Sequence, residues 1–426
     1  MGGKPFYGWA IVGVVFLLTF IYQIQYTFGI FLEPMVEQFG WSRGSASGVY
    51  SMGIFILMPM GIFWGRILDK HNPGRLFLVS CTMGGLGLFL SSFIFNLWQF
   101  YITFGLLWGI GWSSLFITST TLVRKWFITK SGLAMGISVS GISIGWAVIM
   151  PVTGHIITNT GWQDAFRFLG ILVWIVGIIA GILLKSPPEN KIKEPDKKVQ
   201  SPLPSKDNST SLPGYEDWEV GEALRSPSFW MMWLSMFLIL MVIFIITSHG
   251  VGFVIGQGIP RETVAYVFGI MGLISISGRL GSGWFADYLI RKGVNTVHSR
   301  RYMLSLSSAL MGVGGIILVT TTSSIQLWIW AFVFGIGYGI HVPQFTTIMG
   351  DMFGMKNLGM LTSLTGLAGG MAGVIGPVLT GVFYDYMGNY MLAYKLVIII
   401  SFLGAIVSLL IRVPEKKVIK VLNYYA

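Results

Sequence analysis

The sequence predicts an all-α polytopic membrane protein with twelve transmembrane helices, arranged as two pseudo-repeats of six. Of its 426 residues, 54% are hydrophobic and only 11% are charged, against roughly 25% charged residues in a soluble domain. Apolar runs long enough to cross a hydrocarbon core of about 30 Å recur along nearly the whole chain. Little sequence remains for a soluble catalytic domain, so we do not expect an enzyme.

The expected spans fall into two groups on either side of a polar segment. In the first half they run over residues 8 to 32, 44 to 66, 76 to 95, 98 to 122, 131 to 154 and 166 to 185. In the second half they run over residues 228 to 255, 262 to 287, 302 to 322, 325 to 349, 357 to 383 and 391 to 412. The segment between them is rich in proline, lysine and serine, which is typical of a solvated linker. We therefore expect an N-terminal bundle over 1–185, a cytoplasmic linker over 186–226, a C-terminal bundle over 227–412 and a cytoplasmic tail over 413–426.

Residues that match at a fixed offset indicate the repeat. Three pairs of glycines are separated by 227 residues, namely Gly132 and Gly359, Gly154 and Gly381, and Gly161 and Gly388. A similar Gly-x-x-x-Asp pattern ends the second span at Asp69 and the eighth span at Asp287. Repeats of this kind place a solute site near the bilayer midplane, between the halves.

A formal net charge of +11 is typical either of a protein that binds nucleic acid or of a membrane protein whose basic residues gather on one side of the bilayer. With the N-terminus in the cytoplasm, nearly all basic residues fall on the cytoplasmic side, and only Arg43, Arg167, Arg261 and Lys395 lie outside. This bias follows the positive-inside rule and predicts that both termini are cytoplasmic. We expect contact with membrane lipid and no nucleic-acid partner.

Several other features argue against cofactors and processing. Cys81 is the only cysteine, so neither an intramolecular disulfide nor a zinc cluster is expected. The apolar stretch from Phe6 to about Leu32 is too long for a signal peptide and lacks a small-residue cleavage site. We expect a multi-pass protein of the cell membrane (an inner or plasma membrane) without a metal, a cofactor or an obligate protein partner.

The loop after the second span resembles the signature loop of the major facilitator superfamily. It reads Gly65, Arg66, Ile67, Leu68, Asp69, Lys70, then Gly74 and Arg75, with two more residues before the second glycine than the family pattern has. The resemblance implies the fold of that superfamily. It also implies that Asp69 and Arg75, with Asp287 in the second repeat, form contacts that control gating at the cytoplasmic side.

Two further segments are similar to the monocarboxylate transporter and oxalate/formate antiporter branch of that superfamily. They are Arg124, Lys125, Trp126, Phe127 with Lys130, Ser131, Gly132, and Leu224, Arg225, Ser226, Pro227 with Phe229, Trp230. The resemblance implies secondary active transport by alternating access, with proton symport as the usual coupling.

Arg279 is the candidate substrate-binding residue with the clearest physical basis. It lies in the middle of the eighth span, among small and apolar residues. A charge there costs about 2.5 to 3.5 kcal/mol on insertion scales, and no acidic residue is expected at mid-helix to neutralise it. Because a guanidinium stays protonated and fits a carboxylate bidentately, an anionic substrate is its natural counter-ion. The alternative is that Arg279 bonds helix carbonyls or water.

The number of buried cations narrows the class of anion. Oxalate transporters have a second cation in helix 11, where this chain aligns Thr365, and animal monocarboxylate transporters have an aspartate where it has Ser275. One cation favours a monocarboxylate such as L-lactate or pyruvate, and these departures leave proton coupling open. Other residues that we expect near the substrate are His249, Phe334, Tyr26, Phe116 and Thr118. Exchange of organic anions of the oxalate/formate type is the alternative, followed by export of other small molecules.

Two other classes receive little support. Residues 141 to 145 match the Gly-x-Ser-x-Gly pattern of serine hydrolases, but they lie inside an expected helix rather than at a strand-to-helix turn. No Gly-x-x-x-x-Gly-Lys-Ser/Thr loop is present, which argues against an ATP-driven pump. A sensor that rarely moves solute is a third possibility, supported only weakly by the linker.

Overall fold

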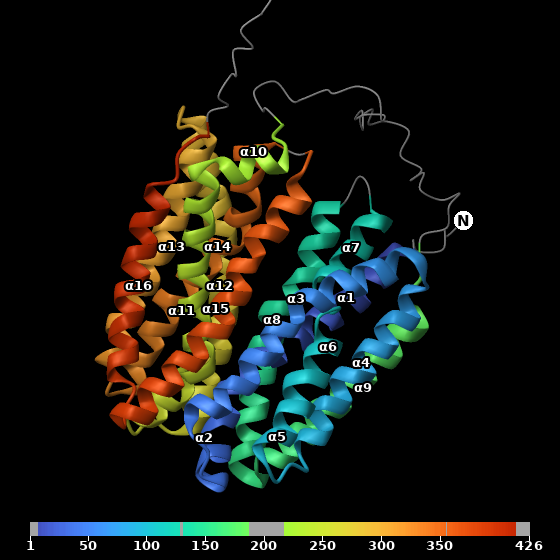
Figure 1. Cartoon of the computed structure of the whole chain (residues 1–426), viewed down its shortest axis with the longest axis vertical. Coiled ribbons are helices and arrows are strands. Elements are labelled where there is room, and N and C mark those ends of the chain that lie inside the picture. The colour runs from blue at the N-terminus through green and yellow to red at the C-terminus, as the bar shows by residue number, and fades with distance from the viewer. Residues whose placement is uncertain (1–6, 128–130, 187–216, 355, 415–426) are drawn as a thin grey trace, which may run out of the picture.

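A computed structural model shows a protein composed of helices arranged in two bundles that lie side by side (Figure 1). It describes residues 7–127, 131–186, 217–354 and 356–414. The helices of the first half form one bundle and those of the second half form the other. We call the end of the molecule at which α9 finishes and α10 begins the linker end, and the opposite end, where α2 finishes, the distal end.

The elements of the first half follow the predicted order. They are α1 (Gly8–Tyr22), the 3₁₀ helix η1 (Gln23–Thr27), α2 (Phe28–Phe39), α3 (Arg43–Lys70), α4 (Pro73–Ser91), α5 (Leu97–Phe100), the π-helix η2 (Tyr101–Trp108), α6 (Gly109–Trp112), α7 (Ile117–Trp126), α8 (Ser131–Thr160) and α9 (Trp162–Leu183). The second half consists of α10 (Val220–Arg225), α11 (Pro227–Ile255), α12 (Arg261–Arg291), α13 (Thr296–Val319), α14 (Ser324–Phe353), α15 (Leu358–Met387) and α16 (Met391–Leu409).

Among the described residues, eleven helical segments are long and apolar enough to cross a membrane. The remaining predicted span, which is the fourth along the chain (residues 98 to 122), consists of four short helical pieces and a turn at residues 113–116. Side chains compete there for helix carbonyls, because Trp64 and Ser113 both donate to the carbonyl oxygen of Ile110, at 2.8 and 2.7 Å. The twelve-span fold is confirmed, with an irregular fourth span.

The two halves touch at their distal ends. Ser51 of α3 donates to the carbonyl of Gly373 in α15 at 3.2 Å, and a Cβ on Gly269 of α12 would lie 2.8 Å from Pro151 of α8. Toward the linker end the same helices diverge (Figure 1). There a Cβ placed on Gly136, Gly281, Gly359 or Gly366 would meet no atom within 4 Å. The described residues therefore adopt a state that is closed at the distal end.

Candidate functional site

Arg279 lies in the middle of α12 and is partly buried. Its guanidinium carbon is 5.9 Å from the centre of the Tyr338 ring in α14. Its Nε is buried and makes no hydrogen bond, and no ion pair of Arg279 is found within the described part of the chain. A half-buried cation without an acidic partner is available to bind an anion.

Tyr338, the ring beside this arginine, is the first of three aromatic rings in mutual contact that come from both halves. Tyr338 meets Trp146 of α8 edge to face, with ring centres 5.3 Å apart, and Trp146 stacks on Tyr26 of η1 at 5.0 Å. We call Tyr26, Trp146 and Tyr338 the central aromatic cluster. Because it joins η1, α8 and α14, it forms a contact between the halves near the middle of the membrane.

Close contact between α12 and α14 fixes the position of Arg279. A Cβ on Gly339 would lie only 2.0 Å from the carbonyl oxygen of Ser275 and 3.0 Å from the backbone nitrogen of Arg279. A Cβ on Gly278 would lie 2.2 Å from the carbonyl oxygen of Ile336. Small residues allow backbones in a membrane to approach in this way, so the arginine extends from a rigid helix pair.

Of the other predicted substrate residues, Tyr26, Ser275 and Phe116 lie in the elements around this centre. Tyr26 belongs to the central aromatic cluster. Ser275 is buried one turn before Arg279, and its hydroxyl donates to the carbonyl of Gly272 at 2.6 Å. Phe116 stacks on Tyr22 with ring centres 5.4 Å apart. The structure thus connects Tyr26 to Arg279 through Trp146 and Tyr338, whereas the ring contact of Phe116 is with Tyr22 of its own half.

Three predicted residues make their hydrogen bonds or ring contacts elsewhere in the described structure, and the side chain of a fourth is not described. Phe334 stacks on Trp330 at 5.5 Å, inside the second bundle. Thr365 is buried in α15, where its hydroxyl donates to the carbonyl of Leu361 at 2.8 Å. His249 lies near the distal end, where its ring nitrogens are 3.2 Å from the Tyr390 hydroxyl and 3.0 Å from the Ser47 hydroxyl. The side chain of Thr118 lies outside the described residues.

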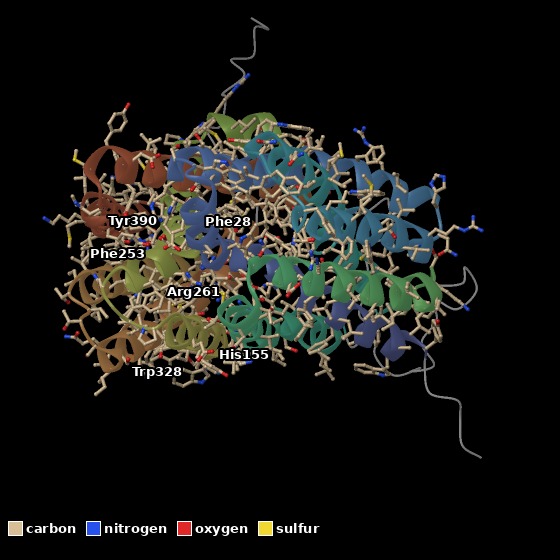
Figure 2. All side chains as sticks on the ribbon, turned by 90° about the horizontal axis from the view of Figure 1, so that it is seen from below. Phe28, His155, Phe253, Arg261, Trp328 and Tyr390 are labelled. Carbon is tan, nitrogen blue, oxygen red and sulfur yellow. The ribbon has the colours of Figure 1, made fainter. Side chains whose placement is uncertain are left out.

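Polar residues gather around His249 at the distal end of the molecule. Arg43 pairs bidentately with Glu33 and donates to the Tyr390 hydroxyl at 2.8 Å. Asp385 of α15 accepts from the backbone N–H of Arg43 at 2.8 Å. We call these five residues the distal network. Figure 2 shows Tyr390 beside Phe253 in the view from this end, and their ring centres are 6.3 Å apart.

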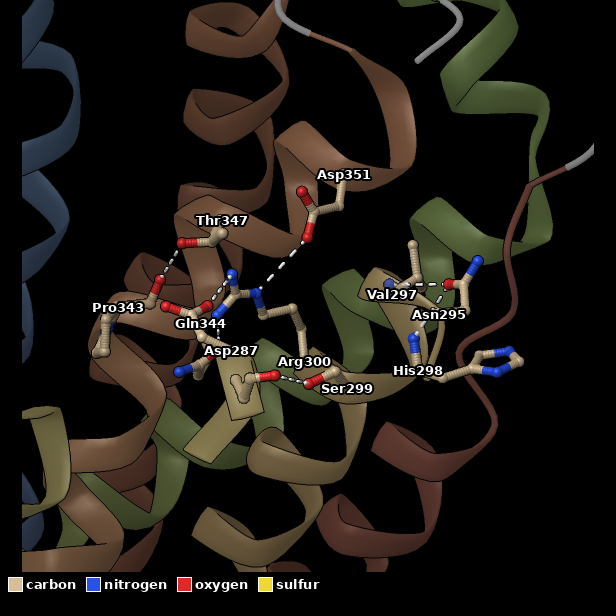
Figure 3. A network of polar contacts seen from close by, with 11 residues as sticks. Asp287, Asn295, Val297, His298, Ser299, Arg300, Pro343, Gln344, Thr347 and Asp351 are labelled. Carbon is tan, nitrogen blue, oxygen red and sulfur yellow. Dashed lines mark hydrogen bonds and ion pairs between the residues drawn. The ribbon is translucent and has the colours of Figure 1, made fainter. Parts of the chain in front are cut away.

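A second polar group lies at the linker end of the C-terminal bundle (Figure 3). Arg300 of α13 contacts Asp287 of α12 at 3.3 Å, Asp351 of α14 at 3.6 Å and the Gln344 side-chain oxygen at 3.4 Å. Arg300 therefore joins three helices of one half, and Asp287, predicted as a gating residue, is one of its partners. Of its predicted counterparts, Arg75 is exposed, and the side chain of Asp69 lies outside the described residues.

Replacing Arg300 with glutamine should destabilise the C-terminal bundle. The Arg300 and Asp351 side chains are only 13% and 14% exposed, whereas Asp287 is 63% exposed. Because removing one member of a partly buried ion pair leaves a poorly solvated charge, we expect Arg300→Gln to cost about 2 kcal/mol. Asp287→Asn should cost less than about 1 kcal/mol, because its ion pair is exposed to solvent. Thermal unfolding of both variants in detergent checks this order, and equal losses would contradict it.

Sequence reasoning missed Trp146 and two glutamines. Gln23 and Gln25 are buried in η1, and the amide nitrogen of each makes no hydrogen bond within the described structure. The indole nitrogen of Trp146 is buried and unpartnered in the same way. Because polar side chains inside a span are costly and usually functional, the two glutamines in the first apolar stretch were a usable signal. Trp146 carried no such signal, since tryptophan is common in apolar helices.

Comparison with known proteins agrees with this geometry. Residues 14–297 and 294–423 match the family model of the Major Facilitator Superfamily. The chain is 23% identical over 411 residues to monocarboxylate transporter 13 of Rattus norvegicus, covering 96% of this chain and 89% of that protein. It is 24% identical over 408 residues to monocarboxylate transporter 12 of Xenopus laevis, covering 92% and 85%. It is 22% identical over 400 residues to human monocarboxylate transporter 2, covering 91% and 82%.

Among solved structures, the fold is similar to that of a bacterial homolog of the human lysosomal transporter Spinster, crystallised in an inward-facing and unoccupied conformation. The TM-score is 0.73 at 13% identity, and the match covers 96% of this chain and 98% of that one. The chain belongs to the major facilitator superfamily and is a multi-pass secondary transporter, not an enzyme. The predicted superfamily and the distant relation to monocarboxylate transporters are confirmed.

Proposed function

We propose that this transporter carries short monocarboxylates of the L-lactate and pyruvate class, with the substrate carboxylate bound by Arg279. The observation that carries the proposal is the half-buried guanidinium that has no acidic partner among the described residues. Its planar donors match a carboxylate in two-point contact. The names of the relatives point to the same class of substrate.

The surroundings of Arg279 favour a small anion with one carboxylate. The rings of the central aromatic cluster, of which Tyr338 lies beside Arg279, would supply apolar contacts for a short carbon chain. A dicarboxylate would be better balanced by two cations, and Thr365 is buried with its hydroxyl bonded to its own helix. A monocarboxylate also needs no second cation to leave the site electrically neutral.

We further propose that transport is coupled to protons and that the linker end faces the cytoplasm. Arg279 does not release its proton near neutral pH, so a proton would cross on the substrate carboxyl or on another group. The positive-inside bias supports the orientation. The two halves would then rock around a site at Arg279, opening it alternately to each side.

Uptake of labelled L-lactate into proteoliposomes containing a pH dye tests this function. We expect an inward proton gradient to accelerate uptake and the lumen to acidify as lactate enters. Pyruvate should compete better than oxalate. Uptake that requires an anion preloaded inside, without acidification, would favour exchange of the oxalate/formate type. Uptake that is indifferent to lactate and pyruvate but inhibited by lipophilic cations would contradict the proposal.

A further inference from the structure

The carboxylate of Asp385 caps a helix of the opposite half. Its Oδ1 accepts the backbone N–H of Arg43 and its Oδ2 accepts the backbone N–H of Gly44, both at 2.8 Å. These are the first two residues of α3, so the carboxylate lies at the positive end of the helix dipole. Capping bonds are normally made by a residue beside the helix, whereas this one comes from α15 in the other bundle.

Around this contact, the charges of the first half are already balanced. Glu33 pairs with Arg43 inside the N-terminal bundle, and a change in the angle between the halves does not separate them. Asp385 therefore depends for its stabilisation on the two backbone N–H groups and the dipole at the start of α3. Several contacts of the distal network cross between the halves. In the contact between Asp385 and the start of α3, the acceptor is a charged group of the second half.

The remaining members of the distal network, His249 and Tyr390, are uncharged. The donor and the acceptor in each of their hydrogen bonds can be assigned. His249 Nε2 lies 2.9 Å from the carbonyl oxygen of Pro377, which can only accept, so Nε2 carries the proton. Nδ1 then accepts from the Tyr390 hydroxyl at 3.2 Å, and that hydroxyl accepts from Arg43 at 2.8 Å. The two bonds of His249 are contacts between neutral groups, whereas Arg43 adds a charge-assisted bond across the halves to Tyr390 and lies 3.9 Å from the centre of the Tyr384 ring. Arg43 thus supports the contact that Asp385 makes with its backbone.

Two glycines, Gly44 and Gly381, allow the close approach of Asp385 to the start of α3. A Cβ on Gly44 would lie 3.0 Å from Asp385 Oδ2, and a Cβ on Gly381 would lie 2.6 Å from the Gly44 nitrogen. A cavity of about 620 Å³ opens beside this contact and is lined by Glu33, Arg43 and Tyr390, among others. Water in that cavity can solvate the groups that are released when the contact breaks.

We propose that Asp385 is an electrostatic latch that holds the distal ends of the two halves together, so that loss of its charge opens the transporter on the distal side. At the linker end, by contrast, a Cβ placed on Gly136, Gly281, Gly359 or Gly366 would meet no atom within 4 Å among the described residues. The latch therefore sets the balance between the two orientations of the carrier. This inference does not depend on which solute is carried.

Distances between spin labels across the distal end test the latch. Phe95, between α4 and α5, and Ile325, at the start of α14, are 76% and 73% exposed and belong to different halves. Cysteines placed at both sites can be labelled, because the native Cys81 is buried. Pulsed electron–electron spin resonance on the purified protein in nanodiscs then reports the separation of the halves without any substrate.

We expect Asp385→Asn to raise the ratio of long to short distances about fivefold, the equivalent of losing a charged helix cap. Glu37→Gln is the matched control, because Glu37 is an exposed carboxylate that lines the same cavity, and it should leave the distances unchanged. Asp385→Glu, which keeps the charge, should fall between wild type and Asp385→Asn. Distances in Asp385→Asn that match the wild type, or an equal shift in Glu37→Gln, would overturn the latch. Because no substrate is present, failure of the lactate proposal would not affect this result.

Discussion

Replacing Arg279 with alanine should reduce L-lactate uptake by about 100-fold or more. Truncating one partner of a desolvated, hydrogen-bonded charge pair costs about 2 to 5 kcal/mol, and each 1.4 kcal/mol is a factor of ten. Among the described residues, the position in α15 that aligns with the second cation of the oxalate transporters is Thr365, which is uncharged and bonded to its own helix. Initial uptake rates in proteoliposomes, corrected for the amount of reconstituted protein, measure the loss.

Two further variants show whether the loss reflects charge or shape. Arg279→Lys keeps the charge but loses the planar fork, so we expect uptake well below wild type and above the alanine variant. Arg291→Ala removes an exposed arginine at the end of the same helix and should leave uptake near wild type. If Arg279→Ala retained normal uptake, another group would have to bind the carboxylate.

Replacing Gly339 with alanine should both destabilise the protein and reduce transport. The added Cβ would lie 2.0 Å from the Ser275 carbonyl oxygen, and the obstacle is backbone rather than a flexible side chain. Overpacking of this kind costs about 1 to 3 kcal/mol. Because α12 must shift, Arg279 would also move relative to Tyr338. Thermal unfolding in detergent and lactate uptake measure the two effects.

Gly281→Ala is the control for this substitution. Gly281 lies in α12 two residues after Arg279, and a Cβ there meets no atom within 4 Å. Alanine is the better helix former, so the control should be neutral or slightly stabilising. A Gly339→Ala variant as stable and active as Gly281→Ala would mean that the α12–α14 contact does not position the arginine.

Much of the fold was predictable because lipid imposes one simple rule. Every span must satisfy its own backbone, so apolar length alone located the helices. The irregular fourth span was not predictable, since it depends on Trp64 of a different helix donating to the Ile110 carbonyl. The 3₁₀ stretch in the first span likewise has no local signal such as a proline.

Site residues could be predicted from the sequence where placing them in a membrane is costly in any orientation. They could not be predicted where their position depends on how the helices pack. Arg279 was identifiable because a charge at mid-membrane needs a reason wherever it points. Phe334 and Trp146 are both large aromatic residues on apolar helices, yet only Trp146 reaches the neighbourhood of Arg279, through Tyr338. The role of His249 depends on Tyr390, which is 141 residues away along the chain and comes close only in the folded protein.

The most direct test of the account is equilibrium binding of labelled L-lactate to purified wild-type and Arg279→Gln protein near neutral pH. We expect saturable binding to the wild type, competition by other short monocarboxylates, and an affinity at least about 100-fold weaker in the variant, as the loss of a charge-assisted bidentate contact requires. Unchanged affinity in Arg279→Gln would contradict the assignment of the carboxylate to this arginine.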